Sequence, residues 1–121
     1  MHELSIAQNI ISIVEQELAK REVQSKVQKI FFNAGRMNAI IPDSLIFGFN
    51  TLKKETKLLH EAKLEINETP LILKCRKCGK DFEIDEPVFV CNFCGSTDIE
   101  VVSGKDMYIE SIELEDEITG G

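Results

Sequence analysis

Apolar residues recur at intervals of three and four along the first part of the chain. The main stripe and the residues that widen it are Leu4, Ile6, Ala7, Ile10, Ile11, Ile13, Val14 and Leu18. This spacing predicts an amphipathic helix whose apolar side is buried. Ser5 and Gln8 match a capping box, which favours a start near Ser5, although a start at His2 also fits. We expect the helix to end near Glu22.

Further along, the pattern predicts three strands and a second helix. The strands are expected at 27–32, 63–67 and 105–114, and the apolar parity of the third changes near Ser111. Pro42, Asp43 and Ser44 form a helix start signal with Asp43 as the N-cap, and this helix should run to about Lys57. Its buried side should carry four apolar residues, namely Leu45, Phe47, Phe49 and Leu52.

These elements predict an α+β fold, with two helices covering one face of a three-stranded sheet. The cysteine-rich segment lies between the second and third strands. We therefore expect a discontinuous domain made of residues 1–70 and 100–121, with an inserted zinc-ribbon lobe at 71–99.

The four cysteines form two pairs with the spacing C-x2-C-x12-C-x2-C. They are Cys75, Cys78, Cys91 and Cys94, and a glycine follows each pair. Two intervening residues let both thiolates of a pair face one ion, and four thiolates form a closed tetrahedral zinc site. Iron in a rubredoxin-like site shares this preference, so spacing alone leaves it open. The pattern predicts a structural metal, most simply Zn²⁺.

The net charge of −7 lies mostly in the C-terminal segment, where seven acidic residues and one lysine follow residue 98. A nucleic-acid-binding protein would show a basic stripe, so we do not expect DNA or RNA as a partner. No apolar run approaches the roughly 20 residues that span a bilayer. The N-terminus also lacks the pattern of a signal peptide. These features predict a cytoplasmic protein that does not bind membranes.

The short motifs MHELSI, PDSL, the two CxxCG turns and SGKDMYIESIELE occur in this order along the chain. Together they resemble the HypA/HybF family of hydrogenase nickel-insertion proteins. The resemblance implies a nickel metallochaperone for nickel–iron hydrogenase, and in some organisms for urease. It implies a nickel-delivering GTPase, the hydrogenase large subunit and a urease accessory protein as partners. It also implies a Ni²⁺ site at His2, separate from a structural Zn²⁺ site at the cysteines.

The chemistry of the N-terminus fits this implication. The Met1 amine, the His2 backbone nitrogen and the His2 imidazole can form fused chelate rings around one ion, and such nitrogen donors favour Ni²⁺ or Cu²⁺. Glu3 could contribute through its backbone nitrogen or through its carboxylate, which could also orient His2 or contact a partner. A helix N-terminus repels cations, and a deprotonated amide or the Glu3 carboxylate would offset that repulsion.

Three other residues need an interpretation. Arg36 follows Gly35 where relatives more often carry an acidic residue, so an auxiliary ligand there is in doubt. Asp43 could approach the nickel ion, but we favour a structural role at the helix start. His60 is better explained as a solvated loop residue than as a ligand.

Two other functional classes compete with a nickel carrier. One is a zinc-ribbon adaptor in transcription or translation, which the acidity disfavours, and the other is a rubredoxin-like electron carrier. An enzyme is not expected, because the sequence shows no paired acid and base, no activated nucleophile and no phosphate-binding loop.

Overall fold

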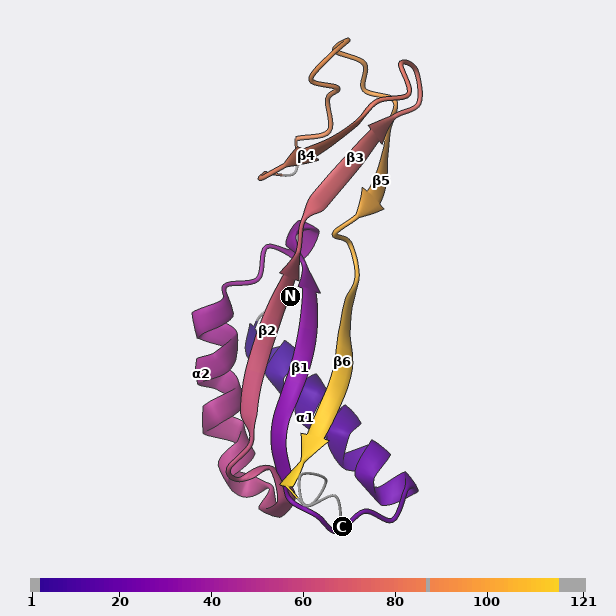
Figure 1. Ribbon diagram of the computed structural model, residues 1–121. Coiled ribbons are helices and arrows are strands. Elements are labelled where there is room, and N and C mark those ends of the chain that lie inside the picture. Colours follow the sequence, from indigo (N-terminus) through magenta and orange to yellow (C-terminus); the bar gives the residue numbers. More distant parts are fainter. Residues whose placement is uncertain (1–2, 87, 116–121) are drawn as a thin grey trace. The chain divides into compact units, whose positions relative to one another are not determined.

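The computed structural model describes residues 3–86 and 88–115, which form two compact units (Figure 1). The first unit is built from residues 3–32, 40–66 and 109–115. The second unit contains residues 33–39 and 67–108. Whether these units act as separate nickel-binding and zinc-binding domains stays a prediction.

The first unit combines two helices with a three-stranded sheet, which confirms the predicted fold class. Helix α1 spans Glu3–Lys20 and helix α2 spans Pro42–Leu52. The strands are β1 (Val27–Gly35), β2 (Lys63–Thr69) and β6 (Met107–Leu114), in the order β2-β1-β6. In Figure 1, α1 crosses behind the sheet and α2 runs beside β2. The core between them includes Ile10, Val14, Ile30, Leu45 and Phe49.

The buried face of α1 is narrower than its apolar sequence suggests. Ile6, Ala7, Ile10, Ile11, Val14 and Leu18 are buried. Leu4 and Ile13 are 51% and 54% exposed, so the prediction that they join the core is wrong. The helix also begins at Glu3, so Ser5 lies inside it and the predicted capping box does not mark its start.

Helix α2 differs from its prediction at both ends. Ile41 occupies the N-cap position without a side-chain hydrogen bond, and Asp43 lies in the first turn, so the prediction of Asp43 as N-cap is wrong. The regular helix ends at Leu52 and two 3-10 turns follow, at Lys53–Glu55 and Lys57–Leu59. Phe47 is 74% exposed, which contradicts the expected burial.

The second unit contains a small antiparallel sheet that the sequence analysis did not predict. Its strands are β3 (Leu71–Cys75), β4 (Asp81–Ile84) and β5 (Ile99–Ser103), in the order β4-β3-β5. Lys74 is paired with Asp81 on one side and with Glu100 on the other. Leu71 and Leu73 are fully buried, so the sheet supplies a small apolar base for the cysteine turns.

Two glycines allow three backbone segments of the second unit to lie very close together. The N–H of Gly35 donates to the Asp106 carbonyl at 2.8 Å, and the N–H of Met37 donates to the Gly104 carbonyl at 2.9 Å. A Cβ atom on Gly35 would lie 2.2 Å from the Gly104 carbonyl oxygen, and one on Gly104 would lie 2.5 Å from that of Pro70. Gly104 also has a φ of 94°. No other residue type fits either position without moving the backbone.

The remaining points concern the C-terminal residues and membrane-spanning helices. The C-terminal residues 116–121 lie outside the described residues. Among the helices that the structure describes, none combines the length and apolarity needed to cross a membrane.

Candidate metal centre

Two turns of the second unit bring the four cysteine sulfurs together. Cys75 ends β3, Cys78 follows in the next turn, and Cys91 and Cys94 lie in a second turn before β5. All four sulfurs lie within 4.8 Å of one another. The Cys75–Cys94 and Cys78–Cys91 sulfur pairs are each 3.6 Å apart. The predicted ligands therefore form one cluster.

The two cysteine turns use the same backbone hydrogen bonds. In the first, the N–H of Gly79 donates to the Cys75 carbonyl at 2.8 Å, and the N–H of Cys75 donates to the Lys80 carbonyl at 3.0 Å. In the second, Gly95 donates to Cys91 at 3.0 Å, and Cys91 donates to Ser96 at 2.8 Å. Gly79 and Gly95 have φ values of 79° and 75°, which glycine adopts without steric strain.

Backbone N–H groups also point at the sulfur atoms. The N–H of Cys78 lies 3.4 Å from the Cys75 sulfur, and the N–H groups of Phe93 and Cys94 each lie 3.4 Å from the Cys91 sulfur. Donors of this kind stabilise a thiolate over a thiol, and they orient metal ligands. The sequence showed the glycines of these turns but gave no signal for Phe93 as a donor.

The clustered thiols differ in pKa, with some values lowered and others raised from the ordinary value. Burial acts to raise the pKa of Cys91, but N–H donation from Cys94 and Phe93, together with the Cys78 and Cys94 thiols, brings it down to about 6. N–H donation from Ser96 acts to lower the pKa of Cys94, yet burial and the other three sulfurs raise it to about 11. Four thiolates this close repel one another, so a divalent cation at their centre would relieve the repulsion.

The sulfur geometry fits a tetrahedral ion. Zinc–sulfur bonds of about 2.3 Å place the four sulfurs of a tetrahedron roughly 3.8 Å apart. The two 3.6 Å pairs and the outer limit of 4.8 Å are close to this arrangement. Four protein ligands leave no open coordination position, so the centre suits a structural role.

The predicted nickel site can be described only at its third residue, because Met1 and His2 lie outside the described residues. Glu3 forms the first turn of α1. One of its carboxylate oxygens accepts a hydrogen bond from the backbone N–H of Ile41 at 3.2 Å. The carboxylate thus joins the start of α1 to the residue that precedes α2, a contact that the sequence did not indicate.

The other candidate residues have different surroundings. Arg36 forms ion pairs with Glu68 at 3.7 Å and with Asp85 at 3.2 Å, so its guanidinium links β2 to the bend that follows β4. Asp43 and His60 are both exposed, and His60 lies in the turn before β2. The ion pairs of Arg36 agree with a structural role, and the exposure of His60 agrees with a solvated one. Asp43 lies in the first turn of α2 and not at its N-cap, and none of the three residues belongs to the cysteine cluster.

Comparison with known proteins identifies the family to which the chain belongs. A family model described as "Hydrogenase/urease nickel incorporation, metallochaperone, hypA" matches residues 1–114. The chain belongs to the HypA family. This match covers both the N-terminal motif and the cysteine cluster.

Individual relatives agree along nearly their whole length. A hydrogenase maturation factor HypA from a Nostoc species is 41% identical over 116 residues, which cover 96% of this chain and 97% of the relative. A factor of the same name from Aquifex aeolicus is 35% identical, with coverage of 95% and 98%. The solution structure of the Ni metallochaperone HypA from Helicobacter pylori has a TM-score of 0.66 and 25% identity, with 94% and 97% of the chains covered. The chain therefore shares its fold and length with the family.

Proposed function

We propose that the chain binds Ni²⁺ at its N-terminus and assists nickel insertion during maturation of nickel–iron hydrogenase. The match to the HypA family from residue 1 to residue 114 is the observation that carries this proposal. It includes MHELSI, the segment whose amine and imidazole are suited to nickel. The same role could serve urease. The proposed partners are a nickel-delivering GTPase, the hydrogenase large subunit and a urease accessory protein, and the proposed compartment is the cytoplasm.

In this proposal the ligands are the Met1 amine, the His2 backbone nitrogen and the His2 imidazole. A carrier must release its cargo, so a site at the chain terminus is an advantage, because ligands there exchange without unfolding a core. The Glu3 carboxylate contributes negative charge in the first turn of α1, where the helix dipole is unfavourable to a cation. Its bond to Ile41 also holds the first turn against the start of α2.

The cysteine cluster has a separate role in the proposal. Cys75, Cys78, Cys91 and Cys94 would hold Zn²⁺ and fold the second unit around it. A structural zinc site contributes roughly 10–16 kcal/mol of apparent binding energy, more than the small core of this unit could replace. Metal analysis of the purified chain distinguishes zinc from iron, and a rubredoxin-like iron centre would also give visible absorption.

The decisive experiment is a Ni²⁺ titration of three proteins that all lack a tag. They are the native chain, a chain with two small residues added before Met1, and the variant His2→Ala. The extension converts the amine into an amide, and the substitution deletes the imidazole. We expect nickel affinity to fall at least tenfold in both, with zinc retained.

The variant His60→Ala is the matched control, because it removes an exposed histidine from the same unit. It should bind nickel like the native chain. Equal nickel affinity in the native, extended and His2→Ala proteins would refute the N-terminal site.

A further inference from the structure

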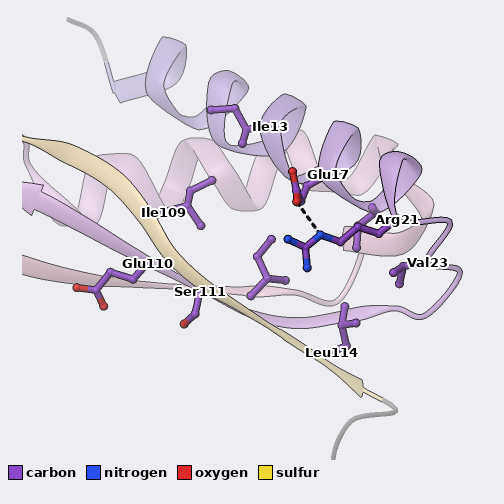
Figure 2. Close-up of a pocket in the computed structure, with 10 residues that line it drawn as sticks. Ile13, Glu17, Arg21, Val23, Ile109, Glu110, Ser111 and Leu114 are labelled. Atoms are coloured by element: carbon purple, nitrogen blue, oxygen red, sulfur yellow. Dashed lines mark hydrogen bonds and ion pairs between the residues drawn. The ribbon is translucent and has the colours of Figure 1, made fainter.

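A groove of about 580 Å³ lies between the C-terminal half of α1 and strand β6 (Figure 2). The apolar residues that line it are Ile13, Leu18, Val23, Ile109, Ile112 and Leu114. Figure 2 shows the Ile109 side chain pointing toward α1, while Glu110 points away from it. Ile13, with 54% of its surface exposed, forms part of the helix side. The groove is therefore an open apolar slot and not a filled core.

Strand β6 lies at the edge of its sheet. In the strand order β2-β1-β6, the described residues provide β6 with one neighbour, β1. An edge strand offers backbone N–H and carbonyl groups on its outer side to a further strand. Beside the groove, a further strand could place alternate side chains between α1 and β6 while its backbone pairs with β6.

The charges beside the groove favour one kind of occupant. Arg21 is the one cationic residue in the lining, and it forms an ion pair with Glu17 at 2.7 Å. The edge strand itself carries Glu110 and Glu113, and Glu115 follows it. An incoming strand with basic residues would neutralise these carboxylates, whereas an acidic strand would be repelled.

The same charges disfavour the two occupants that this chain could supply. A second copy would pair β6 with itself and bring Glu110 and Glu113 of both copies into one short ribbon. The C-terminal residues of the chain include Asp116 and Glu117, which would add carboxylates to those of β6. Like charges on adjacent strands are destabilising.

We propose that the β6 edge and the groove beside α1 bind an extended basic segment of a partner protein, in which aliphatic residues alternate with lysine or arginine. The segment adds a fourth strand beside β6, with its aliphatic side chains in the groove and its basic side chains near Glu110 and Glu113. This surface does not involve the proposed nickel ligands or the cysteine cluster, so its test is independent of the proposed function.

The probe is a synthetic peptide of alternating lysine and valine, KVKVKVK, with blocked ends. Binding is followed by amide chemical shifts of the zinc-loaded full chain. We expect shifts to concentrate at residues 13–23 and 109–114, and the affinity to fall as salt is added. The glutamate analogue EVEVEVE and the rearranged peptide KKVVVKK should each bind at least tenfold more weakly. The peptide has two sets of alternate backbone nitrogens, and only one set can face β6. Methylation of that set should abolish binding, because it removes the N–H donors that pair with β6.

Two variants, each with a matched control, test the surface of the chain itself. Glu110→Lys should weaken binding of KVKVKVK at least tenfold, whereas Glu15→Lys on the exposed side of α1 should leave it unchanged. Ile13→Ser should weaken binding at least fivefold, whereas Val102→Ser, at an exposed residue of β5, should not. Equal binding of the lysine and glutamate peptides, or unchanged binding by Glu110→Lys and Ile13→Ser, would overturn the proposal.

Two further results would assign the groove to this chain instead, and either one overturns the proposal. The first is a dimer, detected by sedimentation equilibrium, that Ile13→Ser dissociates. The second is a chain ending at Glu115 that binds the peptide more than tenfold tighter than the full chain, since this would show that residues 116–121 occupy the groove.

Discussion

The Glu3 carboxylate accepts a hydrogen bond from the backbone N–H of Ile41, at a distance of 3.2 Å. Ile41 is the N-cap residue of α2 and has no side-chain capping bond of its own. The bond therefore supplies from α1 a part of the anchoring that a capping side chain would give α2. It also fixes the residue next to the proposed nickel ligands to a second element of the unit.

This contact predicts different outcomes for two substitutions. Glu3→Ala removes both the acceptor and the first-turn charge, and it should lower the free energy of unfolding by about 1 kcal/mol. Glu3→Gln keeps an acceptor oxygen and should lose about half as much. Chemical denaturation of the zinc-loaded proteins measures both values, with Glu15→Ala on the exposed side of α1 as the control. Equal loss in the alanine and glutamine variants would show that charge alone matters at this position.

Lowering the pH should release Ni²⁺ from the protein before Zn²⁺. An imidazole with an ordinary pKa of about 6.5 must be neutral to bind nickel, so Ni²⁺ should dissociate as the pH falls from 7 toward 5. The pKa of Cys91 is lowered from 9.0 to about 6, so its thiolate form is favoured above that pH and is lost only as the pH falls through it. A bound cation holds the thiolates at still lower pH. Elemental analysis of desalted protein at pH 7.5, 6, 5 and 4 should show nickel lost before zinc. Simultaneous loss would contradict separate sites.

Phe47 and Phe49 provide a comparison of two phenylalanines on one helix. Phe49 is fully buried and Phe47 is 74% exposed. Phe49→Ala should therefore lower the free energy of unfolding by about 3–5 kcal/mol. Phe47→Ala should change it by no more than about 0.5 kcal/mol. Thermal denaturation distinguishes the two, and a large loss in the Phe47 variant would show that its ring is covered in solution.

Gly104→Ala should be among the most damaging small substitutions in the second unit. The added Cβ would lie 2.5 Å from the Pro70 carbonyl oxygen, at a φ of 94°. We expect a loss of more than about 2 kcal/mol, since steric overlap adds to the backbone strain. Gly79→Ala is the control, because its φ is also positive but no other atom lies within 4 Å of the added Cβ. It should cost only about 1 kcal/mol. Similar losses in both variants, measured with zinc content, would rule out the overlap.

Local periodicity predicted the elements of the first unit well, because α1, β1, α2, β2 and β6 each repeat apolar residues over several turns or pleats. It could not predict where a buried face ends. Leu4, Ile13 and Phe47 are as apolar as their buried neighbours, and their exposure depends on elements distant in the sequence. The start of α1 shows the same limit, since Glu3 is joined to Ile41, 38 positions away.

The cysteine cluster was predictable for a different reason. The ligand spacing is a local property of each turn, so all four sulfurs could be assigned without knowing the strands around them. The strands β3, β4 and β5 were missed because each has only four or five residues. Such short segments are defined by their partners, as Lys74 is by Asp81 and Glu100.

The nested order of the cysteine pairs has a practical consequence for protein engineering. The sulfur contact between Cys78 and Cys91 closes a loop of 13 sequence positions, and the contact between Cys75 and Cys94 closes a loop of 19. The segment between β4 and Cys91 lies inside both loops. Doubling the length of a flexible loop costs only about 0.6 kcal/mol of closure entropy. An affinity tag, which would block the proposed nickel ligand at the Met1 amine, can therefore be inserted in this segment, next to the exposed residues Val88 and Val90. Such an internally tagged chain would keep both its free N-terminus and its four thiolates.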